Sequence, residues 1–99
     1  MLNEEERGFI GNVEQQLLFA KKKFPDSFGC MCALTEEVGE LAKALMDEPS
    51  NNVYKEAVQV ATMAMRVALE GDYSLDSVRT IRGANKHPSI GDRNESRSI

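Results

Sequence analysis

The sequence has no tryptophan, and it contains only one histidine, two cysteines and three prolines. Cys30 and Cys32 are two residues apart, so on a helix they would point to different faces, which disfavours a disulfide between them. They also supply too few ligands for a structural zinc site. His87 has no serine, cysteine or acidic partner at a spacing typical of a catalytic triad. These scarcities argue against a disulfide framework, a zinc finger and a triad hydrolase.

Long apolar runs and an excess of positive charge are missing as well. No run approaches the roughly 18 apolar residues of a membrane span. The net charge of −4 argues against binding to a nucleic-acid backbone. Glu4, Glu5 and Glu6 are unlike the basic, then apolar, start of a secretory signal. We therefore expect a cytoplasmic protein whose partners are neither a membrane nor a nucleic acid.

What the sequence does contain is apolar residues repeating at helical spacing. The pattern predicts an all-α fold with a single domain over residues 1–86 and an irregular polar tail over 87–99. The expected helices cover residues 4–23, 28–47, 53–70 and 75–84.

Capping residues set the expected ends of these helices. Asn3 is a suitable N-cap for the first helix, and Pro25 follows its end. We expect Asp26 or Ser27 to cap the second helix, Asn51 or Asn52 the third, and Ser74 the fourth. Gly71 is expected to end the third helix.

The third helix, over residues 53–70, is apolar nearly all the way round, which predicts burial of most of its surface. Its small residues would allow a neighbouring helix, including one of a second subunit, to approach closely. A chain of 99 residues also buries only a modest core. We therefore expect a four-helix bundle that is completed by oligomerisation, as a homodimer or a homotetramer.

Acidic residues stand at the edge of the apolar stripe of the second helix. That stripe is formed by Leu34, Val38, Leu41 and Leu45. At about 100° per residue, Glu37 and Glu40 lie one turn apart beside the stripe, whereas Glu36 falls on the far side. Glu37 and Glu40 could therefore bind one ligand together. The alternative is a solvated acidic edge without a ligand.

A second polar pair, Glu56 and Gln59, lies one turn apart on the third helix. Antiparallel packing of the two helices would bring both pairs to one site. Hard oxygen ligands suit Mg²⁺ or Mn²⁺ rather than zinc, and magnesium usually shares its coordination sphere with substrate phosphates. Because the sequence has no P-loop motif, this indicates nucleotide or pyrophosphate chemistry of another kind.

The pattern Glu36-Glu37-x-x-Glu40, followed after fifteen residues by Glu56-x-x-Gln59, resembles the E-E-x-x-E…E-x-x-D signature of the MazG-like all-α nucleotide pyrophosphohydrolases. Ala84-Asn85-Lys86 is similar to a weaker pattern near the end of that family. The resemblance implies Mg²⁺-dependent cleavage of nucleoside triphosphates to monophosphate and pyrophosphate by helical subunits that associate. It also implies that Glu37, Glu40 and Glu56 are metal ligands.

The sequence departs from that signature at Gln59, where the family has aspartate. The amide oxygen can still coordinate, but it carries no charge, which should weaken metal binding. We hypothesise that Glu36 and Glu37 are the catalytic residues, and that Glu36 orients a ligand or a water molecule. The phosphates would be contacted by basic and amide side chains, namely Lys23, Arg82, Asn85 and Lys86.

Two other interpretations remain open on the sequence. One is a non-catalytic nucleotide-binding or metal-binding bundle that lost its activity at Gln59. The other is a plain helical interaction module whose acids are structural. Phe24 and Phe28, on either side of the first turn, are either core residues or a stacking surface for a nucleobase.

Overall fold

The computed structural model describes residues 1–81, and the regular structure in that part of the chain is entirely helical. This confirms the predicted all-α class. Residues 82–84 of the expected fourth helix and the tail over 87–99 lie outside the described residues. The elements are α1 (Glu4–Lys23), α2 (Cys30–Asp47), α3 (Ser50–Glu70), the 3₁₀ turn η1 (Tyr73–Leu75) and α4 (Asp76–Ile81).

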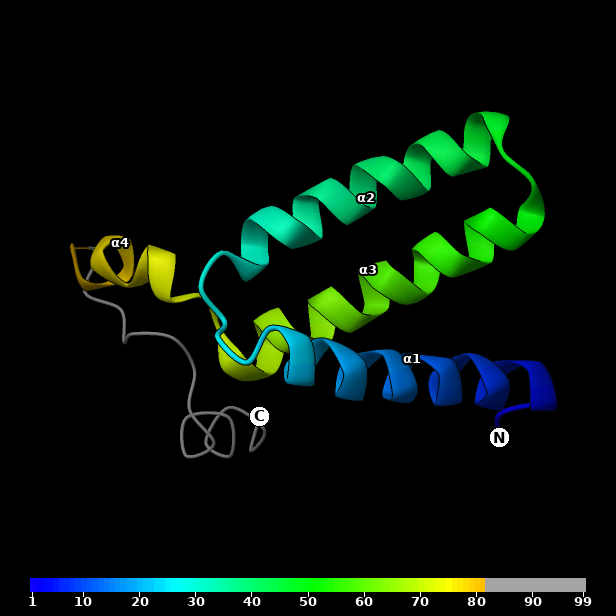
Figure 1. Ribbon diagram of the computed structural model, residues 1–99, viewed down its shortest axis with the longest axis horizontal. Coiled ribbons are helices and arrows are strands. Elements are labelled where there is room, and N and C mark those ends of the chain that lie inside the picture. The colour runs from blue at the N-terminus through cyan, green and yellow to red at the C-terminus, as the bar shows by residue number, and fades with distance from the viewer. Residues whose placement is uncertain (82–99) are drawn as a thin grey trace.

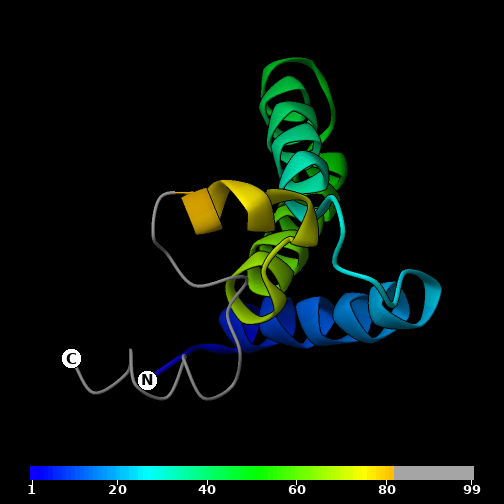
Figure 2. The same ribbon diagram turned by 90° about the vertical axis from the view of Figure 1, so that its left-hand side faces the viewer.

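Helix α3 lies in the middle and packs against both α1 and α2 (Figure 1). Helices α2 and α3 form an antiparallel hairpin, and α1 crosses α3 at a steep angle (Figure 2). Within residues 1–81, no helix combines the length and the apolarity that a membrane crossing requires. The arrangement leaves α2 covered by protein on the side of α3 and open on its outer side.

Helix α1 begins as its sequence predicts. The Asn3 side chain accepts a hydrogen bond from the Glu6 amide at 2.8 Å, and the Glu6 carboxylate accepts one from the Asn3 amide at 2.8 Å. This reciprocal capping box satisfies two amide groups that the first turn leaves unpaired. Lys21, Lys22 and Lys23 occupy the last turn, where they complement the negative end of the helix dipole.

The start of α2 differs from the expectation that Asp26 or Ser27 caps it. The N-cap is Gly29, with a φ of 81° that favours glycine, and the helix begins two residues later than predicted. The cap comes from far along the chain, because the Asp72 carboxylate accepts hydrogen bonds at 2.8 Å from the Gly29 and Met31 amides. A contact across more than forty residues is tertiary, so a local capping rule could not find it.

The start of α3 also differs from the prediction. Pro49 is the N-cap, which places both Asn51 and Asn52 inside the helix rather than at its cap. The helix ends as expected at Gly71, whose φ is 74°. Beyond it, Ser74 lies inside η1, two residues before α4 begins, and donates its amide and hydroxyl to Asp72, which is the N-cap of η1.

Helix α3 is less buried than its composition predicts. Its buried residues form a single row at spacings of four, namely Val58, Thr62 and Arg66. Met65 and Leu69, with Ala64 and Ala68, are exposed, because neither α1 nor α2 covers that side of the helix. Within one copy of this chain, α3 is therefore covered less than the expected burial of most of its surface.

Candidate metal centre

The α2–α3 hairpin determines which acids meet. Glu40 lies eight residues before Glu48, the C-cap of α2, and Glu56 lies eight residues after it. Because both helices rise by about 1.5 Å per residue, the two side chains reach the same height along the hairpin. Glu37 is one turn further from the connection on α2, on the same side as Glu40.

The three carboxylates predicted to converge do so. One oxygen from each of Glu37, Glu40 and Glu56 lies within 4.8 Å of the others. Glu37 and Glu56 are partly buried between the helices, whereas Glu40 is exposed. The cluster therefore faces the solvent on one side and the helix interface on the other, which is a suitable position for an exchangeable cation.

Two carboxylate oxygens of this cluster have no hydrogen-bond partner within residues 1–81. Glu37 Oε2 and Glu56 Oε2 are both buried, and neither accepts a hydrogen bond. Burying a carboxylate oxygen without a partner costs free energy, because the group loses its water and gains nothing in return. Burial, followed by the negative charges of Glu40 and Glu56, raises the pKa of Glu37 to about 7. Burial and the neighbouring Glu40 also raise the pKa of Glu56.

No side chain of the described chain neutralises the cluster through an ion pair. Lys43, one turn after Glu40 in the sequence, instead contacts Glu48 at 3.3 Å. Another ion pair joins Arg66 to Glu70 at the other end of α3. The three acids therefore share a site in which a bound cation would relieve both their repulsion and their lost solvation.

A cavity of about 510 Å³ adjoins the acidic cluster. Glu37 on α2 and Gln59 on α3 both line it, so Gln59 reaches the cavity that Glu37 also reaches. The cavity extends along the C-terminal end of α1 and the loop before α2. Apolar side chains make up much of the remaining wall, including Phe19, Phe24, Phe28 and Met63.

Phe24 and Phe28 are exposed, so their interpretation as core residues is wrong for this chain. Both rings line the cavity, together with Lys23. The Lys23 ammonium lies 5.7 Å from the ring centroid of Phe19 and 5.4 Å from that of Phe24. A cation and aromatic faces thus stand together at the rim, an arrangement suited to an anionic ligand with a flat ring.

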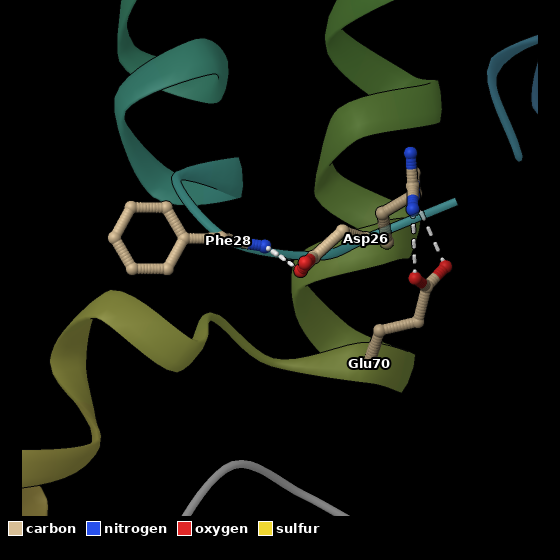
Figure 3. A network of polar contacts seen from close by, with 4 residues as sticks. Asp26, Phe28 and Glu70 are labelled. Carbon is tan, nitrogen blue, oxygen red and sulfur yellow. Dashed lines mark hydrogen bonds and ion pairs between the residues drawn. The ribbon is translucent and has the colours of Figure 1, made fainter. Parts of the chain in front are cut away.

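Arg66 is a residue of this cavity that the sequence reasoning missed. Its side chain is only 2 % exposed, and it donates to both carboxylate oxygens of Glu70, from Nε at 3.1 Å and from Nη2 at 2.9 Å (Figure 3). The available signal was the i, i+4 row of Val58, Thr62 and Arg66. A cation in such a row has to find a buried partner.

The other residues named from the sequence are not all near the cluster. Glu36 is exposed, and its negative charge makes only a small contribution to raising the pKa of Glu37, after burial and the charges of Glu40 and Glu56. Arg82, Asn85 and Lys86 lie outside the described residues. The structure therefore brings together Glu37, Glu40 and Glu56, and it places Gln59 and Lys23 in the lining of the cavity that Glu37 adjoins.

Comparison with protein-family models, with curated proteins and with solved structures found no match to this chain. The case for a function thus depends on the geometry. Three hard oxygen donors converge, and one of them, Glu37, also lines a cavity with aromatic and cationic walls. Such a donor set fits Mg²⁺ or Mn²⁺ in its ligand chemistry.

Proposed function

We propose that this protein is a cytoplasmic, Mg²⁺-dependent nucleoside triphosphate pyrophosphohydrolase, a member of the MazG-like type that its motif resembles. The observation that carries the proposal is the convergence of Glu37, Glu40 and Glu56, with two buried oxygens lacking hydrogen bonds, next to a cavity of about 510 Å³ that Glu37 lines. A divalent cation held by these acids would supply the missing partner, and a triphosphate would supply the remaining ligands.

Each residue has a role in this proposal. Glu37, Glu40 and Glu56 would hold Mg²⁺ or Mn²⁺, which when bound supplies positive charge to neutralise the phosphates. Glu37 would also orient the attacking water, and Glu36 would support it by orienting a ligand or water. Lys23 would contact phosphate oxygens from α1, while Arg82, Asn85 and Lys86 would contact them from beyond the described residues.

A panel of nucleoside triphosphates with Mg²⁺ and with Mn²⁺, analysed for both products, tests the proposal. We expect nucleoside monophosphate and pyrophosphate in equal amounts, and no turnover when the metal is chelated. Release of inorganic phosphate and nucleoside diphosphate would contradict the proposed reaction.

A substitution at Gln59 distinguishes the proposed enzyme from the alternative of a non-catalytic bundle. Its side chain lines the same cavity as Glu37 but contributes no charge. We predict that Gln59→Asp binds Mg²⁺ more tightly and hydrolyses nucleoside triphosphates faster than the parent, while being less stable without metal because a fourth acid adds repulsion. Metal titration, pyrophosphate release and thermal unfolding measure the three effects.

Two outcomes would change the assignment. If affinity and rate are unaffected, Gln59 is not in the site. If affinity rises while both proteins are inactive across the panel, the alternative of a non-catalytic nucleotide-binding or metal-binding bundle replaces the enzyme.

We also propose that a second copy covers the outer side of α2, in a homodimer or a homotetramer. Met31, Val38 and Leu45 are seven residues apart on this helix and are 42, 49 and 67 % exposed. Residues at this spacing share one face, so they form a continuous apolar row without a partner in a single chain.

Sedimentation velocity at micromolar concentration tests the association. We expect the parent chain to be at least dimeric and Val38→Asp to dissociate it, because a charge would be buried at the interface. Glu14→Gln, an exposed change on α1, is the matched control. A monomeric parent would contradict the proposal.

A further inference from the structure

The face of α1 opposite its buried side is unpartnered in a single chain. Val13 and Ala20 are the buried residues of this helix, which packs against α3. At about 100° per residue, six residues at spacings of four and three lie within about 40° of the point opposite Val13, namely Glu4, Gly8, Gly11, Gln15, Leu18 and Lys22. We call these six residues the outer row of α1. Both views place α1 at the edge of the molecule, with no helix of residues 1–81 on this side (Figures 1 and 2).

Two glycines of the outer row have no explanation within one chain. Gly8 and Gly11 lie inside α1, and the glycines of residues 1–81 that have a positive φ are Gly29 and Gly71. A Cβ atom at Gly8 or Gly11 would meet nothing within 4 Å. Glycine destabilises the interior of a helix relative to alanine, so both residues weaken α1 without relieving any crowding in the chain. A second helix that packs closely on this face would account for both.

The charges of α1 indicate which helix fits this face. They lie at opposite ends, with three glutamates in the first turn and three lysines in the last turn. Of these, Glu4 and Lys22 belong to the outer row, and neither forms an ion pair within residues 1–81. An antiparallel copy of the same helix brings each acidic end to the basic end of the other, whereas a parallel copy sets like charges side by side. The pattern therefore favours a second copy of this chain in antiparallel orientation.

The register that pairs these charges also pairs the apolar part of the outer row. If Glu4 lies opposite the partner's Lys22, residues equally far from position 13 face each other. Leu18, which is 63 % exposed in a single chain, then lies over the partner's Gly8. A leucine side chain thus meets a position that has none. Charge and shape agree on one register, and two-fold symmetry makes each of these contacts occur twice.

We propose that α1 pairs antiparallel with α1 of a second copy through its outer row, a contact separate from the one proposed for α2. Helix α3 lies between α1 and α2, so the two contacts use different sides of the molecule (Figure 1). With both contacts the chain forms a homotetramer, in which each copy touches two others. Exposed ion pairs contribute little affinity, so the charges fix orientation and register, while close packing at Leu18 and the glycines holds the pair.

Sedimentation velocity of the full chain carrying Val38→Asp tests the α1 pairing by itself, because that substitution removes the contact proposed for α2. We expect this variant to be a dimer at micromolar concentration. Adding Leu18→Asp should make it monomeric, because a charge would be buried where the helices meet. Met46→Asp, a change at another exposed apolar residue, is the matched control and should leave the dimer intact. A monomeric Val38→Asp variant, or a dimer that survives Leu18→Asp, would overturn the inference.

Charge reversal in the same Val38→Asp background tests the antiparallel register. Glu4→Lys and Lys22→Glu each place like charges opposite one another at both ends of the pair, so each should raise the dimer Kd about tenfold. The two variants mixed in equal amounts should associate with each other, because both facing pairs are then opposite in charge. One chain carrying both changes should also dimerise as the background variant does. No recovery in the mixture and in the doubly changed chain would overturn the antiparallel pairing.

The same series separates this inference from the contact proposed for α2. A tetrameric parent with a dimeric Val38→Asp variant supports both contacts. A dimeric parent that Val38→Asp leaves dimeric and Leu18→Asp makes monomeric supports the α1 pairing alone. A dimeric parent that Val38→Asp makes monomeric supports the α2 contact and overturns the α1 pairing.

Discussion

Replacing Glu37 with glutamine is expected to reduce pyrophosphate release by at least about 100-fold, the loss typical when one group that stabilises the transition-state charge is removed. The amide keeps the volume of the carboxylate but carries no charge and cannot accept a proton. The same substitution should stabilise the protein in the absence of metal, because it removes the most strongly perturbed member of the acidic cluster. Opposite changes in activity and stability are typical of a site residue rather than a core residue.

The stability change should depend on pH in a defined direction. Burial, with Glu40 and Glu56, raises the pKa of folded Glu37 from 4.5 to about 7, so the folded state holds this proton more tightly than the unfolded state. The protonated Glu37 side chain contributes fully to the free energy of unfolding below pH 4.5. This contribution, up to about 3 kcal/mol, is lost as the pH rises towards 7.

Urea unfolding of the metal-free protein at pH 4.5 and at pH 8 measures this effect. Glu37→Gln should be clearly more stable than the parent at pH 8, and the gap should narrow at pH 4.5. Glu14→Gln is the control, because Glu14 is exposed on α1. An identical pH dependence for Glu37→Gln and the parent would show that Glu37 is not held in the cluster.

Replacing Asp72 with asparagine is expected to destabilise the fold by about 2 to 4 kcal/mol, as charged hydrogen bonds are lost at a buried cap. The carboxylate is 6 % exposed and accepts from the Gly29, Met31 and Ser74 amides and from the Ser74 hydroxyl, at 2.6 to 2.9 Å. It therefore joins the segment after α3 to the first turn of α2. Asparagine would turn an NH₂ group towards backbone donors.

The pKa of Asp72 gives this prediction a pH signature. Burial alone would raise it, but the hydrogen bonds from Ser74, Met31 and Gly29 outweigh burial and lower it from 3.8 to about 2. The carboxylate therefore stabilises the fold above pH 4, and this contribution is lost as the pH falls towards 2. Chemical unfolding of Asp72→Asn and of Asp47→Asn measures the difference, and equal stability of the two variants at pH 7 would contradict the capping role.

Local rules predict much of this fold. Asn3 with Glu6 is a complete capping signal within four residues, and Gly71 ends α3 as expected from its position. The meeting of Glu37, Glu40 and Glu56 was also predictable, because helical periodicity and an antiparallel hairpin are sufficient to bring the three side chains together.

The missed features depend on contacts between distant segments. The Asp72 cap joins residues more than forty positions apart, and no propensity at Asp26 or Ser27 reveals it. The apolar composition of α3 predicted burial, but burial requires neighbours, and α1 and α2 do not cover Met65 and Leu69. Arg66 was missed because a charged residue in a buried row is identified only by its partner, Glu70.

Calorimetric titration of Mg²⁺ into the parent chain and into Glu37→Gln, Glu40→Gln and Glu56→Gln tests the central claim most directly. The three carboxylates converge within 4.8 Å, so each should contribute to a single site. We predict that the parent chain binds Mg²⁺, that each substitution weakens binding, and that Glu14→Gln leaves it unchanged. Magnesium binding of the same strength in the parent and all three variants, or no binding by the parent, would contradict a metal centre at this position.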